Sequence, residues 1–156
     1  MRIRSMLATA AVAASTIIGF AAPAQAADLP NQNIRGQWCT NITQIGAKDT
    51  ASAAGVTALT VRQYKAVCNG SWKNFANIFV WEQFHAKGFA YNASAGVLVA
   101  DSTSASGWRE GVNRDREVFS EPVSSIAYCT RGMGKIRFHQ GGTWKESGLG
   151  LSSRVC

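Results

Sequence analysis

Residues 58–84, ALTVRQYKAVCNGSWKNFANIFVWEQF, decide the fold, because they read as two strands joined by the dipeptide Asn69-Gly70. Asn-Gly is the strongest short-range signal for a β-hairpin, since a type I′ turn requires positive φ at both central residues. With these two residues in the turn, Cys68 faces Ser71 and the pairing continues outward. The predicted partners are Tyr64 with Phe75, Val61 with Ile78, Thr60 with Phe79, Leu59 with Val80 and Ala58 with Trp81.

This register places similar side chains opposite one another, aromatic with aromatic and branched with branched, as in stable strand pairs. Both faces of the hairpin carry apolar residues. A strand pair with two apolar faces must be covered on both sides, so we expect this hairpin inside a sheet rather than at its edge.

The rest of the chain reads as short strands separated by turns rich in glycine and serine. We expect strands at residues 37–42, 95–100, 114–120 and 125–130, loops at 46–55 and 101–107, and a turn at 131–134. No segment combines helical length with an apolar stripe at helical spacing. The pattern therefore predicts an all-β fold, an antiparallel β-sandwich or barrel of short strands stapled by disulfides.

The first 26 residues have the features of an export signal. Arg2 and Arg4 form a basic start, an alanine-rich apolar run follows, and Ala24-Gln25-Ala26 fits a small-x-small cleavage site. Cleavage there leaves residues 27–156, which is 156 − 26 = 130 residues and the size of one domain. We therefore expect a secreted, extracellular protein with no membrane span after the signal is removed.

Four cysteines, Cys39, Cys68, Cys129 and Cys156, all lie in the expected mature chain. An even number in a small exported chain predicts two disulfides. No pair has C-x-x-C spacing, so a structural zinc site is not favoured, and we expect no metal and no cofactor. Three connectivities are open. Cys39–Cys68 with Cys129–Cys156 is favoured because it closes the shorter loops, and each bridge contributes about 2–4 kcal/mol.

The formal net charge is +7, and removal of Arg2 and Arg4 lowers it to 7 − 2 = +5. The basic residues are spread along the chain without a run of lysine or arginine, so nucleic acid is not implied as a partner. This balance permits attraction to an anionic envelope such as teichoic acid or lipid headgroups.

A second hairpin, around Gly141-Gly142, holds the candidate site. A two-residue turn there places His139 opposite Trp144 and Arg137 opposite Glu146, all on one face, while Ile136 and Phe138 point to the core. Histidine and glutamate can act as acid and base, arginine can hold an anion, and tryptophan can stack on a base or sugar.

The alternative for this face is an ordinary solvated sheet surface, on which Arg137 and Glu146 form a common cross-strand pair. Four tryptophans, Trp38, Trp72, Trp108 and Trp144, lie near predicted turns or strand ends. They are candidates for stacking on a polysaccharide, and the alternative is that they fill the core of a small domain.

Residues 60–87, TVRQYKAVCNGSWKNFANIFVWEQFHAK, also carry a family resemblance. The segment resembles the VRQY–C–W–VW–F core of small secreted actinobacterial proteins that have no assigned activity. It covers about one fifth of the expected mature chain. The resemblance implies secretion and a β domain, and it supplies no catalytic residues.

Three functions follow as hypotheses. The first is a secreted, non-enzymatic protein that binds a cell-wall polymer or an extracellular protein; charge reversal at Arg131, Lys135 and Arg137 then weakens binding. The second is a small secreted hydrolase with a ribonuclease-like acid–base site at His139, Glu146 and Arg137. The third is an inhibitor of an extracellular enzyme, with residues 101–107 as its exposed loop. The sequence favours a protein that is not an enzyme.

Overall fold

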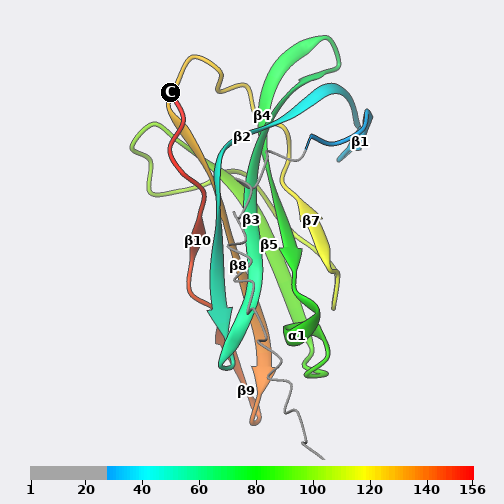
Figure 1. The fold of residues 1–156 in the computed structure, drawn as a ribbon, viewed down its shortest axis with the longest axis vertical. Coiled ribbons are helices and arrows are strands. Elements are labelled where there is room, and N and C mark those ends of the chain that lie inside the picture. The colour runs from blue at the N-terminus through cyan, green and yellow to red at the C-terminus, as the bar shows by residue number, and fades with distance from the viewer. Residues whose placement is uncertain (1–27) are drawn as a thin grey trace, which may run out of the picture.

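The computed structural model describes residues 28–156, and the predicted export signal at residues 1–26 lies outside them. Two antiparallel sheets pack face to face (Figure 1). Sheet A has the strand order β1-β2-β3-β4-β7, with β1 at Gln32–Ile34, β2 at Gln37–Ala53, β3 at Val56–Cys68, β4 at Ser71–Val80 and β7 at Glu117–Phe119.

Sheet B has the order β10-β8-β5-β6, and β9 pairs with β8 beside this path. Its strands are β5 at Tyr91–Val99, β6 at Ser106–Glu110, β8 at Thr130–Gln140, β9 at Thr143–Glu146 and β10 at Gly150–Leu151. A single turn of helix, α1 at Glu82–His85, links the sheets. The predicted antiparallel all-β fold is confirmed, and it is a sandwich.

The predicted central hairpin is confirmed as β3 and β4. Asn69 and Gly70 both have positive φ, 49° and 79°, as a type I′ turn requires. The pairing of residues 59–68 with 71–80 follows the predicted register without a shift, and Trp81 N donates to Ala58 O at 2.9 Å. The hairpin lies inside sheet A, between β2 and β7, as its two apolar faces predict.

The predicted loop at residues 46–55 is wrong for most of its length, because β2 continues through it to Ala53. The strand bends at three register shifts, and only Ala54-Gly55 form the turn to β3. Ala51 and Ala53 are buried in the core, so the small residues of this segment pack closely. The C-terminal segment covers the strand edge, where Ser153 N donates to Ala47 O at 2.9 Å.

The predicted strand at residues 125–130 and turn at 131–134 are also wrong, because β8 begins at Thr130 and runs through the supposed turn. Gly132 and Gly134 face sheet A. A Cβ on Gly134 would overlap the side chain of Ile78, and a Cβ on Gly132 would lie 3.1 Å from Arg62 O. These glycines therefore allow the two sheets to approach closely and do not reverse the chain.

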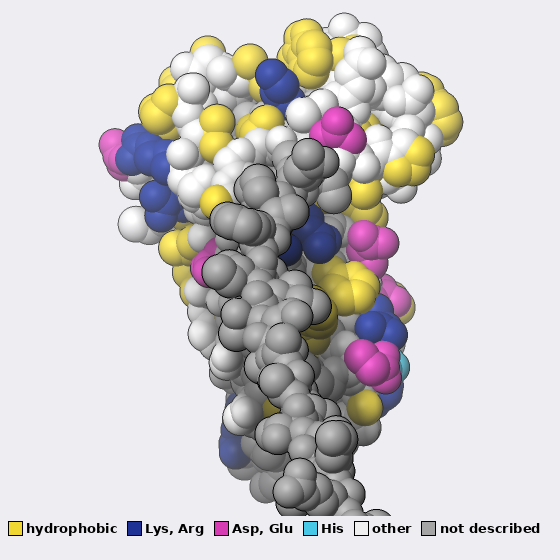
Figure 2. Space-filling view, viewed as in Figure 1, with side chains coloured by type: hydrophobic (Ala, Val, Ile, Leu, Met, Phe, Trp, Pro, Cys, Tyr) yellow, Lys and Arg dark blue, Asp and Glu magenta, His cyan; other side chains and the backbone are white. Residues whose placement is uncertain are grey.

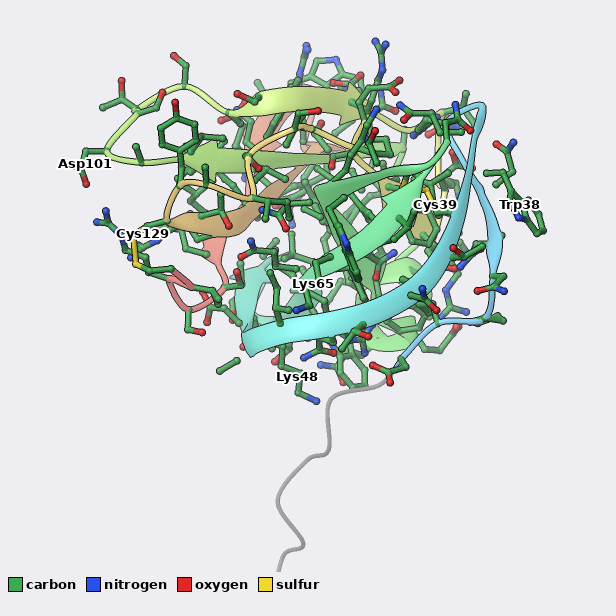
Figure 3. The ribbon with its side chains drawn as sticks, turned by 90° about the horizontal axis from the view of Figure 1, so that it is seen from above. Trp38, Cys39, Lys48, Lys65, Asp101 and Cys129 are labelled. Atoms are coloured by element: carbon green, nitrogen blue, oxygen red, sulfur yellow. A yellow bond between two sulfur atoms is a disulfide. The ribbon has the colours of Figure 1, made fainter. Side chains whose placement is uncertain are left out.

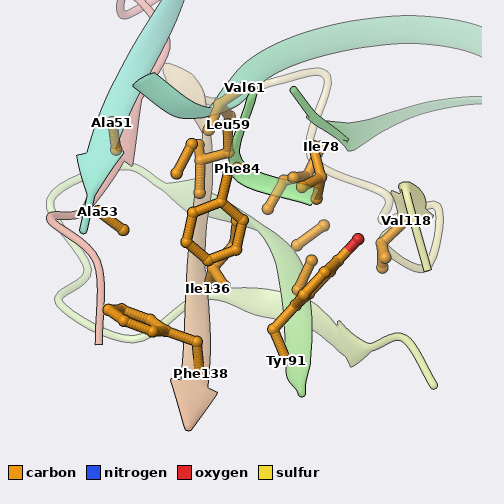
Figure 4. Packing of buried hydrophobic residues seen from close by; sticks show 14 of the residues in the cluster. Ala51, Ala53, Leu59, Val61, Ile78, Phe84, Tyr91, Val118, Ile136 and Phe138 are labelled. Atoms are coloured by element: carbon orange, nitrogen blue, oxygen red, sulfur yellow. The ribbon is translucent and has the colours of Figure 1, made fainter. Parts of the chain in front are cut away.

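The main core lies between the sheets (Figure 4). Leu59, Val61 and Ile78 from sheet A meet Ile136 and Phe138 from sheet B. A second cluster lies on the opposite face of sheet A and contains Ile34, Ile42, Tyr64, Phe75 and the disulfide between Cys39 and Cys68.

The second disulfide joins Cys129 to Cys156 and is drawn beside the Cys129 label in Figure 3. The structure thus pairs the cysteines as the shorter-loop argument favours.

Candidate functional site

Strand β8 alternates strictly between buried and solvent-facing residues. Its buried positions are Thr130, Gly132, Gly134, Ile136 and Phe138. The positions between them place Arg131, Met133, Lys135, Arg137 and His139 on the outer side of sheet B. Successive outward residues are about 7 Å apart, so Arg131 and Arg137 are separated by about 20 Å along the strand.

The β8–β9 hairpin adds its residues to the same side, as predicted. Gly141 and Gly142 have φ of 61° and 79°, and His139 pairs with Trp144 while Arg137 pairs with Glu146. We use the name β8 face for the outward residues of β8 together with Trp144 and Glu146 from β9 and with Trp108, which lies over Gly96 of β5 beside Met133. Its members are Arg131, Met133, Lys135, Arg137, His139, Trp144, Glu146 and Trp108.

Arg137 stacks on Trp144, with its guanidinium carbon 4.8 Å from the ring centroid. The His139 ring meets the same indole edge-on at 5.5 Å. Trp144 remains 48% exposed. Arg137 has no ion-pair partner within residues 28–156, so its charge is held on an aromatic surface and is free to meet an external anion.

Glu146 lies opposite Arg137 as predicted, but it forms its ion pair with Lys135. Both carboxylate oxygens accept from Lys135 Nζ, at 2.8 and 2.9 Å. Glu146 lies opposite Arg137 in the register, yet the aromatic contact draws the arginine toward Trp144. The β8 face is therefore neutralised at Lys135 and charged at Arg137.

The acid–base interpretation of His139 requires a partner that orients its ring. In the described part of the chain, no carboxylate is hydrogen-bonded to His139, and Glu146 is engaged by Lys135. His139 is exposed and contacts Trp144. The hydrolase remains a hypothesis that this geometry does not favour.

A hollow of about 370 Å³ lies beside Lys135 on the same side of sheet B. Its apolar lining comes from Trp108, Met133 and Leu149, and its polar lining from Lys135, Thr103 and Ser104. Trp108 lies across Gly96 of β5, where an added Cβ would be 2.8 Å from Trp108 Cε3. Because Gly96 has no side chain, the Trp108 indole has room to lie over the β5 backbone.

Arg131 lines a second hollow, of about 230 Å³, at the other end of β8. Arg154 lies in the same hollow and forms an ion pair with Asp101 at 2.9 Å. Arg131 has no ion-pair partner within the described residues. The β8 face thus has an unneutralised arginine near each end and an aromatic hollow between them.

The predicted inhibitory loop at residues 101–107 is largely a turn, and β6 begins within it at Ser106. Ser102 and Ser104 hydrogen-bond to each other across the turn, and Asp101 is held by Arg154. The loop forms one wall of the hollow beside Trp108. Its part in inhibition stays a hypothesis.

The other exposed tryptophans lie away from the β8 face. Trp38 is 56% exposed, and Figure 3 places it on the opposite side of the molecule from Asp101. Trp72, next to the β3–β4 turn, has Lys65 Nζ 5.6 Å from its ring centroid. In Figure 2, exposed hydrophobic side chains gather at the upper end, where Figure 1 shows β1 and the β3–β4 hairpin.

The other histidine, His85, belongs to a closed structural network. Arg114 Nη2 lies 3.2 Å from His85 Nε2, and since guanidinium can only donate, Nε2 accepts. His85 Nδ1 then donates to the Tyr91 hydroxyl at 2.8 Å, and that hydroxyl donates to Arg114 O at 3.1 Å. Both ring nitrogens are used, so His85 holds α1 against β5.

Within residues 28–156, no group of three histidine, cysteine, aspartate or glutamate side chains is placed to hold a metal ion. Over the same residues, no helix has the length and apolar character that a membrane crossing requires.

Sequence reasoning names Arg131 as a binding charge and Trp108 as a stacking candidate, but it does not place either on the β8 face, and it does not single out Met133. The composition of residues 131–134 predicts a turn that contains Arg131 and Met133. Trp108 falls in a segment that gives no clear strand or helix pattern. The signal for Arg131 and Met133 is present in residues 130–139, TRGMGKIRFH, where large polar or flexible residues alternate with small or apolar ones.

The chain matches no protein-family model, no curated protein and no solved structure.

Proposed function

We propose that this protein is secreted and binds an anionic polymer of the cell envelope through the β8 face, without catalysing a reaction. The observation that carries the proposal is the row of Arg131, Lys135 and Arg137 on the outward side of one strand. Like charges on one strand face repel one another. An anionic chain along the strand relieves that repulsion at several points at once.

The charges of the row support a polymer more than a small anion. Arg131 and Arg137 have no ion-pair partner among the described residues, and they lie about 20 Å apart. A single small anion cannot meet both. A linear polyanion can, and several weak exposed contacts then act together through high effective concentration.

An oxidising, extracellular environment is supported by the two disulfides and by the absence of free cysteines among the described residues. The proposal adds that residues 1–26 are removed on export. The N-terminal residue of protein recovered from a culture medium tests this directly, and we expect Ala27. An intact Met1 on exported protein would contradict cleavage at this site.

Co-sedimentation of the oxidised protein with purified bacterial cell walls, at low and at high salt, tests the binding function. We expect binding at low salt that falls steeply at high salt, because the range of attraction between exposed charges shortens from about 30 Å at 0.01 M salt to about 3 Å at 1 M. A protein that stays in the supernatant at low salt would overturn the proposal.

A further inference from the structure

The hollow beside Lys135 is built by the fold rather than left by loose packing. Trp108 from β6 lies over Gly96 from β5, and an added Cβ there would be 2.7 Å from Ala105 Cβ and 2.8 Å from Trp108 Cε3. Gly96 pairs with Met133 of β8, whose side chain lines the same hollow. Three elements therefore place an indole, a thioether and a backbone floor side by side.

The lining has the chemistry that a sugar ring requires. Trp108, Met133 and Leu149 offer apolar surface, and Leu149 is half exposed. Lys135 and the hydroxyls of Thr103 and Ser104 supply polar groups around that surface. A pyranose ring has an apolar face of C–H groups and a rim of hydroxyls, so it matches both parts, and the indole offers a surface for stacking.

The surroundings of the hollow indicate which sugars fit. Met133 lies on β8 between Arg131 and Lys135, each about 7 Å away along the strand, and Arg137 follows Lys135 at the same spacing. A neutral glycan would leave Arg131 and Arg137 without an anionic partner. A polysaccharide whose rings carry acidic groups would place a ring over Trp108 and acidic groups beside the flanking cations.

We infer that the hollow formed by Trp108, Met133 and Leu149 over Gly96 is a sugar-binding subsite, and that the polymer bound by the β8 face is an acidic polysaccharide. This inference rests on the proposed function, and it adds the site and the substrate class. It assigns sugar stacking to Trp108, and neither Trp38 nor Trp72 takes part.

The test compares three polymers on the intact, oxidised protein by isothermal titration calorimetry. Polygalacturonate carries sugar rings and carboxylates, polyphosphate carries charge alone, and dextran carries sugar rings alone. We expect polygalacturonate to bind more tightly than polyphosphate and dextran to bind weakest. Equal or tighter binding of polyphosphate would overturn the inference and leave the charge-based function standing.

Variants locate the subsite. We expect Trp108→Ala to weaken polygalacturonate binding about tenfold, the loss that follows from exposing an aromatic contact, and to leave polyphosphate binding unchanged. Trp38→Ala is the matched control, since Trp38 is exposed on another side of the molecule, and it should change neither. An unchanged affinity for polygalacturonate in Trp108→Ala would contradict the proposed sugar-binding subsite.

Leu149→Ser is a second variant, and it changes a side chain outside the core because Leu149 is half exposed. It should weaken polygalacturonate binding and not polyphosphate binding, and an unchanged affinity would contradict the subsite. Arg137→Gln should weaken both polymers. If the parent protein binds neither polymer, the proposed function fails together with the inference, whereas loss of the Trp108 and Leu149 effects alone removes only the inference.

Discussion

The guanidinium of Arg137 lies 4.8 Å from the centre of the Trp144 ring, although the residue directly opposite Arg137 is Glu146. The carboxylate of Glu146 instead holds Lys135 with both oxygens. Arg137 therefore has no carboxylate partner on the β8 face, and the charge of Lys135 is neutralised by Glu146. This is the local arrangement on which the proposed anion binding depends.

Glu146→Gln should therefore strengthen binding. The substitution removes the carboxylate that neutralises Lys135, so affinity for an anionic polymer should rise about threefold, the equivalent of one exposed ion pair. Binding to polygalacturonate, measured by calorimetry, checks this. The hydrolase hypothesis instead predicts that this variant loses its cleavage activity, because it assigns Glu146 an acid–base role. Weaker binding in this variant would count against anion binding at the β8 face.

Gly134→Ala should destabilise the protein by about 1–3 kcal/mol, because a Cβ at this position overlaps Ile78 between the two sheets. Gly148→Ala is the matched control. Its Cβ would meet nothing within 4 Å, and its φ is not positive. Urea unfolding of both variants measures the difference. Equal stabilities would mean that the two sheets leave room for a side chain at Gly134.

The two disulfides should contribute unequally to stability. Their sequence separations are 29 and 27 residues, so loop closure gives both about the same stabilisation, roughly 3–4 kcal/mol. Cys39 and Cys68 are fully buried beside Tyr64 and Phe75, whereas Cys156 is exposed. Replacing the buried pair by alanine also leaves a cavity, which costs more. Urea unfolding of the two double variants should show a larger loss for the buried pair, and equal losses would refute it.

Stability should fall at alkaline pH because of two tyrosines. Burial raises the pKa of Tyr64 and of Tyr91 above the ordinary value of 10.0. In the unfolded chain both phenols lose their protons near pH 10, before they do so in the folded protein. Their stabilising contribution is therefore complete below pH 10 and is lost as pH rises through the raised pKa values.

The free energy of unfolding, measured across pH 8 to pH 12 on the parent protein and on Tyr64→Phe, checks this expectation. The variant should lose stability less steeply above about pH 10, since one of the two groups is gone. Parallel curves for the two proteins would show that Tyr64 does not contribute to the alkaline loss.

Both hairpin registers were predictable because their turns are local. Asn69-Gly70 and Gly141-Gly142 fix the partners of the flanking residues through positive φ, and both registers are confirmed. The Arg137, His139, Trp144 and Glu146 face followed from the second turn and strand alternation. Which ion pair Glu146 makes did not follow, because Lys135 and Arg137 compete for it and the stacking on Trp144 decides.

The continuous strand β8 was not predictable from local composition. Gly132 and Gly134 read as turn residues, and their true reason is the nearness of Arg62 and Ile78 on the other sheet. Trp108 was a stacking candidate, but its place beside Met133 was not predictable, because it depends on packing over Gly96 of the neighbouring strand β5. Contacts between elements, rather than patterns within them, set these parts of the candidate site.

The most direct test of binding through the β8 face compares two sets of charge removals in cell-wall co-sedimentation at low salt. One variant carries Arg131→Gln, Lys135→Gln and Arg137→Gln on the β8 face. The control variant carries Lys48→Gln, Lys65→Gln and Lys87→Gln, three exposed lysines outside it. Each set lowers the formal net charge of residues 27–156 from +5 to 5 − 3 = +2.

We predict that the β8-face variant binds about tenfold more weakly than the parent protein, while the control variant keeps most of its binding. Equal losses in the two variants would mean that net charge alone holds the protein to the wall, and would contradict a binding site on the β8 face.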